Sequence, residues 1–222
     1  MEILNLGSHR IGVRFPEKGL CKGKNPAILL NDGALIEQLN LRTERAVLVG
    51  VYPNNRLSEY TPWPEPAIRP GTPGFGGRLG QYHKELTNEI LPTLIDEYAL
   101  DTEKLAYGGY SLGGLAATMS LWETDAFAAV FSLCGSFWYP GVADFIEEHV
   151  PKNYSAQVYL QNGIREGESH NNRLCDAYSY AQRVHTALQA TCGAKTVLDD
   201  YGHHDRQSER LNAALRWVER VL

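Results

Sequence analysis

The amino-acid sequence predicts a three-layer α/β fold, in which a mostly parallel central sheet is covered by helices on both faces. Short apolar runs alternate along the chain with amphipathic helical patterns, and strands separated by helices need crossover connections that place them parallel. The 222 residues are 43% hydrophobic, which is enough for one buried core. We therefore expect a single α/β domain over residues 1–222, with no separate cap domain.

The strands are predicted from six short runs of apolar residues that lack helical spacing. These runs cover residues 27–30, 46–51, 104–108, 128–134, 157–161 and, as the weakest of the six, 196–198. Residues 10–15 precede them and fit an additional antiparallel strand at the edge of the sheet.

The helices are predicted from apolar residues that recur every three or four positions along the chain. Three stripes have this spacing: Tyr82, Leu86, Ile90 and Leu94; Ala177, Ala181, Val184 and Leu188; Leu211, Leu215, Val218 and Leu222. Prolines and glycines interrupt any periodicity between residues 52 and 80. A connection of this length is uncommon in a compact domain unless it shapes a site, so we expect it to form a wall of a binding cleft.

Composition and charge exclude several classes of function. The formal net charge is −5 and the lysines and arginines are scattered, so no basic stripe is available for nucleic acid. No run approaches the length of a membrane span, and the N-terminal residues lack the pattern of a signal peptide. The four cysteines are far apart without a CxxC motif, which favours reduced thiols over a zinc site or disulfides. We expect a cytoplasmic protein.

The sharpest local signal is the sequence Gly-Tyr-Ser-Leu-Gly at residues 109–113, directly after the strand 104–108 and before the helix-forming run 115–122. A nucleophile elbow has this context, because glycines two residues before and after the serine permit a sharp turn that lifts the hydroxyl above the sheet. At the start of a helix, free backbone N–H groups favour developing negative charge. Ser111 is therefore the candidate nucleophile; the alternative is a glycine-rich turn in which Ser111 caps the helix.

A serine hydroxyl is a weak nucleophile, so Ser111 needs a histidine base, and the histidine needs an orienting acid. In this fold the histidine follows the last strand, where both His203 and His204 occur; we prefer His203, which directly follows a glycine. The acid belongs after strand 157–161, and Glu166 is the preferred residue. Glu168, Asp176 and a Ser-His dyad without an acid remain open.

An oxyanion hole needs two backbone N–H donors. One is expected at Leu112, immediately after the nucleophile. The other is expected in the loop after strand 27–30, at Gly33 or Ala34, where a simple turn is nearly as good an interpretation.

Substrate contacts are expected from the loop 54–77 and from the aromatic residues Phe137, Trp138 and Tyr139, which follow a strand end. We select Trp138 and Arg56 as candidate substrate-binding residues. Core filling is the alternative for the aromatic residues, and pairing with Glu59 to brace the loop is the alternative for Arg56.

Several segments in the right order resemble the putative esterase family, which includes enterochelin esterases, esterase D-like enzymes and mycolyl transferases. The resemblance begins near residue 25 and extends to the C-terminus, and it is greatest to small cytosolic enterochelin esterase-like members. It is carried by residues 30–33 (Leu-Asn-Asp-Gly), 56–63 (Arg-Leu-Ser-Glu-Tyr-Thr-Pro-Trp), 109–114, 131–138 (ending in Ser-Phe-Trp), 163–166 and 202–203. The chain departs from the family where two glycines often precede the histidine and a tryptophan follows, since Tyr201 and Ser208 stand nearest to those positions.

The resemblance implies the α/β-hydrolase fold and a serine esterase that forms an acyl-enzyme on Ser111, without an organic or metal cofactor. An acyltransferase of the same fold and a non-catalytic binding module are the alternatives. The expected partners are a small-molecule ester and, in a homo-oligomer, a second copy of the chain, but not nucleic acid or a membrane. The added N-terminal domain of full-length enterochelin esterases has no counterpart here, so specificity for a siderophore trilactone is not implied.

Overall fold

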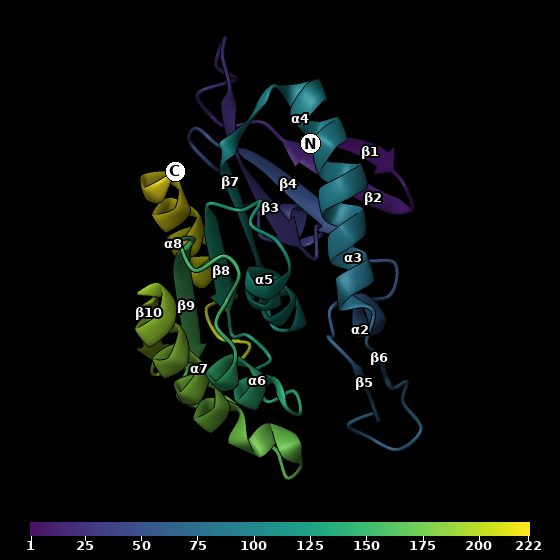
Figure 1. Ribbon diagram of the computed structural model, residues 1–222, viewed down its shortest axis with the longest axis vertical. Coiled ribbons are helices and arrows are strands. Elements are labelled where there is room, and N and C mark those ends of the chain that lie inside the picture. Colours follow the sequence, from purple (N-terminus) through teal and green to yellow (C-terminus); the bar gives the residue numbers. More distant parts are fainter.

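The computed structural model describes residues 1–222 and contains one eight-stranded sheet in the order β1-β2-β4-β3-β7-β8-β9-β10. The pairs from β4 through β10 are parallel, whereas β2 is antiparallel to both β1 and β4. The strands are β1 (Glu2–Leu6), β2 (His9–Arg14), β3 (Asn25–Asn31), β4 (Val47–Tyr52), β7 (Leu100–Tyr110), β8 (Ala129–Leu133), β9 (Gln157–Gly163) and β10 (Lys195–Asp199). The predicted, mostly parallel α/β sheet is confirmed (Figure 1).

Residues 10–15 were expected at the edge of the sheet, but the strand there is second from the edge. β1 pairs antiparallel with β2 and is itself the edge strand. The two form a hairpin with a turn at Gly7, whose φ is 57°. β1 alternates exposed and half-buried residues and lacks the continuous apolar run that marks the central strands, so its sequence signal is weak.

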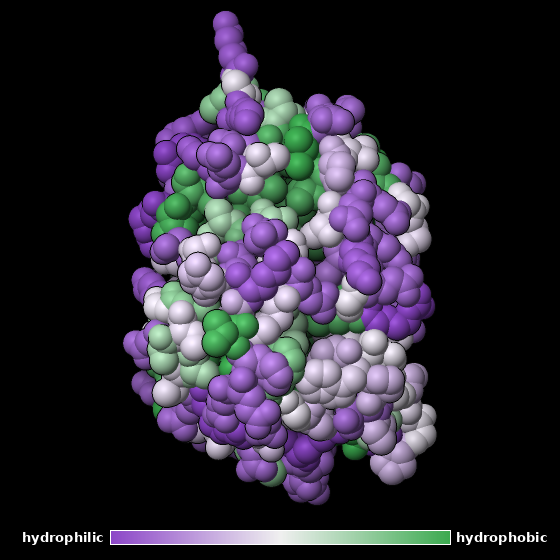
Figure 2. All heavy atoms as spheres, viewed as in Figure 1, coloured by the Kyte–Doolittle hydropathy of each residue, from purple (hydrophilic) through white to green (hydrophobic).

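Helices cover both faces of the sheet because consecutive strand residues point to opposite sides. Leu29 of β3 belongs to a core under α3, α4, α5, α6 and α7, whereas its neighbour Ile28 belongs to a second core under α1 and α8. The helices are α1 (Leu35–Gln38), α3 (Leu79–Glu85), α4 (Leu91–Tyr98), α5 (Leu112–Glu123), α6 (Val142–Glu148), α7 (Ala177–Cys192) and α8 (Gln207–Val221). Figure 2 shows mostly hydrophilic residues on the face of the molecule in view. Apolar residues are visible there mainly between α4 and α8.

The stripe predicted at residues 82, 86, 90 and 94 lies on one continuous helical segment. A π-helical turn, η1 (Leu86–Ile90), joins α3 to α4. All four stripe residues are buried in the larger core.

Residues 53–78, here called the excursion loop, leave the sheet after β4 and return at α3. Instead of being irregular throughout, this loop contains α2 (Arg56–Glu59) and a small antiparallel hairpin of β5 (Pro64–Glu65) and β6 (Phe75–Gly76), which projects away from the main sheet in Figure 1. Asn55 caps α2, since its side-chain oxygen accepts the Ser58 amide at 3.1 Å.

The parallel strands bring the predicted site residues to one edge of the sheet. β3, β7, β9 and β10 all end at this edge, and the segments that follow them carry Ala34, Ser111, Glu166 and His203 respectively. In open α/β sheets this carboxyl edge is where ligands bind.

Candidate active site

Ser111 lies on a strained turn between β7 and α5. Its backbone has φ 60° and ψ −123°, a region that non-glycine residues rarely adopt. A Cβ atom at Gly109 would lie 2.5 Å from the backbone of Gly113, and one at Gly113 would lie 3.0 Å from Cβ of Asn31. Gly109 is therefore required for the turn, and a side chain at Gly113 would have to displace Asn31 by a few tenths of an ångström. Ser111 makes no side-chain hydrogen bond to the helix, so the capping role gains no support.

The predicted serine, histidine and acid are joined by two successive hydrogen bonds. The Ser111 Oγ is 3.1 Å from Nε2 of His203, and the opposite ring nitrogen, Nδ1, is 2.8 Å from Oε2 of Glu166. His203 is about one quarter exposed, whereas Glu166 is only 4% exposed. His204 is exposed, its ring edge-on to that of His203, and it is not hydrogen-bonded to Ser111. Of the two histidines, the structure brings His203 to Ser111.

The other two acids considered from the sequence lie outside this arrangement. Glu168 is exposed and pairs with Arg165 at 3.1 Å, and Asp176 is exposed beside the start of α7. Glu166 is the carboxylate that contacts His203.

Glu166 is held as a carboxylate despite its burial. Burial alone would raise its pKa, but the hydrogen bond and charge of His203 and the amide of Gly163, which donates to Oε1 at 2.7 Å, together lower it. Asn162 adds a longer contact, with Nδ2 donating to Oε1 at 3.3 Å. An ionised Glu166 accepts the Nδ1 proton of His203 and leaves Nε2 as the acceptor for the serine hydroxyl.

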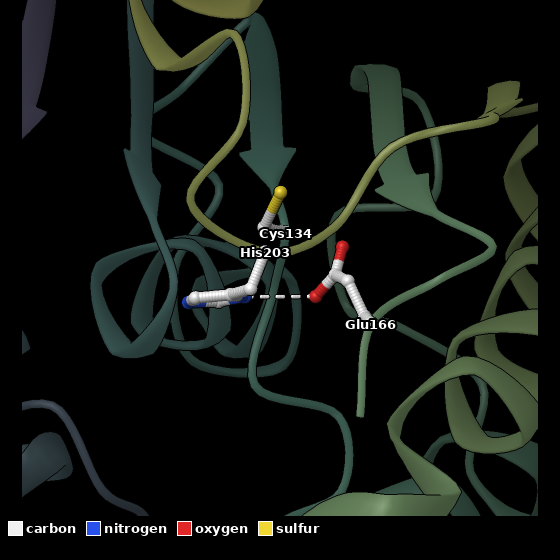
Figure 3. A group of neighbouring side chains, drawn as sticks. All are labelled: Cys134, Glu166 and His203. Atoms are coloured by element: carbon white, nitrogen blue, oxygen red, sulfur yellow. Dashed lines mark hydrogen bonds and ion pairs between the residues drawn. The ribbon is translucent and has the colours of Figure 1, made fainter. Parts of the chain in front are cut away.

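Cys134 lies next to this pair, and the ligand atoms of Cys134, Glu166 and His203 all lie within 4.8 Å of one another (Figure 3). Zinc bonds of 2.0–2.3 Å in a tetrahedron separate ligand atoms by roughly 3.3 Å or more. The Nδ1 to Oε2 distance of 2.8 Å is instead that of a hydrogen bond, and a metal would have to break it. Burial, followed by the charge of Glu166, raises the pKa of the Cys134 thiol, which favours the neutral thiol over a ligating thiolate.

Two backbone amides near Ser111 are free to bind an oxyanion. Leu112 begins α5, so its N–H has no partner within the helix. In the loop after β3, the Gly33 amide donates to the Val51 carbonyl at 3.0 Å, whereas the Ala34 amide donates to no protein group. Of the two residues considered there, Ala34 is the available donor.

Two pockets meet at Ser111 and His203. The polar pocket has a volume of about 400 Å³ and is lined by Asp32, Ala34, Leu35, Gln38, Arg56, Tyr110, Ser111, His203, His204 and Gln207. The apolar pocket has a volume of about 220 Å³ and is lined by Ile68, Ser111, Trp138, Glu166, Gly167, His170, Leu174, Ala177, His203 and His204. The excursion loop supplies Arg56 to one pocket and Ile68 to the other, so it forms part of the cleft wall, as its length and composition indicate.

Arg56 does not pair with Glu59, as one interpretation of the sequence expected. Its Nε donates to both carboxylate oxygens of Asp32, at 2.8 and 3.0 Å, because the turn after β3 brings that residue across the cleft. Glu59 instead accepts the Asn54 amide at 3.0 Å and faces buried His9 at 3.6 Å. Arg56 is therefore braced, yet it still lines the polar pocket.

The three aromatic residues after β8 divide between core and cleft. Phe137 and Tyr139 are fully buried, so core filling is correct for both. Trp138 is half-buried and lines the apolar pocket beside Ser111.

Two buried polar residues that support the site were missed from the sequence. Asn31 donates to the Gly113 carbonyl at 2.9 Å and accepts from the hydroxyl of Tyr82, so it ties β3 to the elbow. Arg210 of α8 reaches the loop that carries His203. Buried polar side chains must be hydrogen-bonded, but no local pattern tells which residues will be buried in this way.

The strand order with β2 antiparallel and the sharp turn from β7 into α5 at Ser111 are those of the α/β-hydrolase fold. A family model described as "Putative esterase" matches residues 9–217. The chain therefore belongs to this esterase family, and it is a carboxylic ester hydrolase.

A relative in sequence and two solved structures are similar to this chain. The uncharacterized protein YbbA of Bacillus subtilis (strain 168) is 28% identical over 204 residues, which cover 83% of this chain and 82% of YbbA. The siderophore hydrolase EstA from Aspergillus nidulans shares the fold with a TM-score of 0.75 and 18% identity, covering 96% of this chain and 90% of EstA. The enterobactin esterase FES from Shigella flexneri shares it with a TM-score of 0.68 and 16% identity, covering 96% of this chain and 55% of FES.

None of the helices combines the length and apolar character needed to cross a membrane.

Proposed function

We propose that this esterase hydrolyses its substrate through an acyl-enzyme on Ser111, with His203 as the general base and Glu166 as the orienting acid. The observation that carries the proposal is the unbroken contact from Ser111 Oγ to His203 Nε2, at 3.1 Å, and from His203 Nδ1 to Glu166, at 2.8 Å. The serine stands on a strained elbow at the start of a helix, as a nucleophile of this class does.

In the first half of the reaction, His203 accepts the hydroxyl proton as Ser111 Oγ bonds to the ester carbonyl carbon. The carbonyl oxygen becomes negative and is bound by the amides of Leu112 and Ala34. His203 then returns its proton to the leaving oxygen as the bond to the alcohol breaks, and the acyl group remains on Ser111.

In the second half, water takes the place of the alcohol. His203 accepts a proton from the water as its oxygen bonds to the acyl carbon, and the free acid leaves as the proton returns to Ser111 Oγ. Glu166 stays ionised throughout and stabilises the positive charge that His203 carries in each step. No metal or organic cofactor has a part in this sequence.

Arg56 and Trp138 are the proposed substrate contacts, one in each pocket. The polar pocket suits groups that form hydrogen bonds, since Asp32, Gln38 and Gln207 line it with Arg56. Because relatives of the same fold are named a siderophore hydrolase and an enterobactin esterase, siderophore esters and phenolic esters belong in the first substrate panel.

The test compares the wild type with Ser111→Ala and Ser136→Ala on short p-nitrophenyl esters, with diisopropyl fluorophosphate labelling in parallel. Ser136 is the matched control, because its hydroxyl lies only 3.3 Å from that of Ser111, whereas the ring nitrogens of His203 bond to Ser111 and Glu166. We expect turnover and labelling to be lost only in Ser111→Ala. Labelling that persists in Ser111→Ala would overturn the proposal, and ester products formed with added alcohol would indicate acyl transfer instead of hydrolysis.

A further inference from the structure

The walls of the apolar pocket come from two segments that are far apart in the sequence. Ile68 belongs to the excursion loop, whereas Leu174 and Ala177 belong to the segment after Glu166, which contains the 3₁₀ turn η2 (Arg173–Asp176) and the start of α7. The width of the pocket therefore depends on how these two segments are held together.

Arg173 is the contact that joins them. Its Nη2 donates to the carbonyl oxygen of Pro66 at 2.8 Å, and its Nη1 lies 3.6 Å from the carboxylate of Glu65, both in the excursion loop. The guanidinium carbon also lies 5.5 Å from the ring centre of Phe75 and 5.6 Å from that of Trp138, the aromatic wall of the pocket.

This contact is of a kind that can open without unfolding the protein. The charged atoms of Arg173 and Glu65 lie 3.6 Å apart, which is longer than a hydrogen bond, so this ion pair holds the segments only weakly. The two segments lie outside the main sheet, and Arg173 meets the larger core only at its rim, over Phe75 and Trp138.

The two pockets differ in what they offer to an ester. The alcohol must leave and water must enter while the acyl group stays bonded to Ser111, so the larger polar pocket suits the exchange of alcohol and water. The apolar pocket, bounded by Ile68, Trp138 and Leu174 and clasped by Arg173, suits the group that stays. Since an apolar cavity of about 150 Å³ holds benzene, its 220 Å³ suits a single aromatic ring or a chain of similar size.

We propose that the apolar pocket binds the acyl group of the ester, and that Arg173 limits the size of that group by holding the excursion loop against the segment 167–177. This inference rests on the proposed role of Ser111. It assigns a substrate class, esters of compact aromatic or short aliphatic acids, and it makes Arg173 a specificity-determining residue that does not touch the reacting atoms.

The experiment measures kcat/KM for p-nitrophenyl acetate, butanoate, hexanoate, decanoate, benzoate and 2-naphthoate. In the wild type, we expect butanoate, hexanoate and benzoate to be preferred, with a fall of about tenfold or more at decanoate and 2-naphthoate. In Arg173→Met, the ratio of large to compact acyl groups should rise about tenfold, because the walls can separate. Arg183→Met is the matched control: this arginine also pairs with carboxylates, Asp144 and Glu147, but lies between α6 and α7 away from the cleft. It should keep the wild-type ratio.

Ile68→Trp tests the pocket without changing the contacts of Arg173. The larger side chain fills the pocket, so preference should move toward acetate, with benzoate falling about tenfold relative to acetate. Unchanged acyl selectivity in both Arg173→Met and Ile68→Trp would overturn the inference. Absence of Ser111 labelling by diisopropyl fluorophosphate in the wild type would instead overturn the proposed mechanism, so the two failures are distinguishable.

Discussion

The guanidinium of Arg210 donates through Nη1 to the carbonyl oxygen of Gly202, the residue directly before His203, at 3.0 Å. The same nitrogen donates to the Tyr110 hydroxyl at 3.2 Å, and that hydroxyl donates to the carbonyl oxygen of His203 itself. The edge of the guanidinium formed by Nε and Nη2 pairs with the carboxylate of Asp199 at the end of β10. Both carbonyl groups that flank the His203 backbone are thus fixed by Arg210, directly or through Tyr110.

Arg210→Met should therefore lower kcat more than it raises KM. We expect kcat to fall about 10- to 100-fold, because a small displacement of His203 removes the base from hydrogen-bond reach of Ser111. Stability should fall by about 1–3 kcal/mol, since Asp199 loses its charged partner but keeps the hydrogen bond from Gln161. Kinetics below the unfolding temperature and urea unfolding measure the two effects. If kcat per folded molecule equals that of the wild type, Arg210 supports only the fold.

Glu166→Gln tests the orienting role of the carboxylate. The glutamine amide would donate a hydrogen bond to Nδ1 of His203, whereas the carboxylate accepts one from Nδ1–H, so the variant favours the wrong tautomer for taking the proton of Ser111. We expect kcat to fall about 10³- to 10⁴-fold with the fold retained. Glu168→Gln, two residues away at the surface, should retain wild-type activity; equal losses in both variants would argue against a specific role for Glu166.

The pH dependence of stability follows from the lowered pKa of Glu166. A carboxyl whose pKa is lower in the folded than in the unfolded protein contributes stability that is fully present above the unfolded value, near 4.5, and is lost as the pH falls through the folded value. The wild type should therefore lose stability relative to Glu166→Gln as the pH falls below about 4.5. Urea unfolding of both proteins between pH 7 and pH 3 gives the difference. A difference that does not change across this range would contradict the lowered pKa.

The residues that could be predicted from the sequence are those whose role is set by neighbours along the chain. The glycines around Ser111, the apolar strands and the glycine before His203 are local signals, and each led to the correct place in the fold. The strand β1, the pairing of Arg56 with Asp32 and the contacts of Arg210 depend on segments that meet only after folding. The sequence could not distinguish Ala34 from Gly33 as the oxyanion donor. The structure distinguishes them by which backbone amide is already hydrogen-bonded, and residue type does not determine that.

Gly109→Ala should destabilise the elbow, because the added Cβ would lie 2.5 Å from backbone atoms of Gly113 that cannot move aside without shifting α5. Overpacking of this kind costs about 1–3 kcal/mol, and loss of esterase activity should accompany it. Gly80→Ala is the control: Gly80 lies inside α3, and its Cβ would come no closer than 3.6 Å to another atom. That variant should gain up to about 1 kcal/mol, because alanine favours helix more than glycine does. Thermal unfolding compares the two, and equal stability would contradict the close packing of the elbow.

The pairing of Arg56 with Asp32 also determines how the polar pocket responds to charge. The Asp32 carboxylate neutralises the guanidinium at 2.8 Å, so an anionic substrate group gains little from Arg56 in the wild type. Asp32 has a φ of 57°, a conformation that asparagine tolerates, so Asp32→Asn removes the charge while retaining the turn. The variant should favour esters with a carboxylate in the alcohol part over neutral esters of the same size, by about fivefold to tenfold in relative kcat/KM at low salt, and this preference should shrink as salt is added. If the ratio of kcat/KM for the two esters is the same in the wild type and in Asp32→Asn, Arg56 braces the excursion loop without facing the bound substrate.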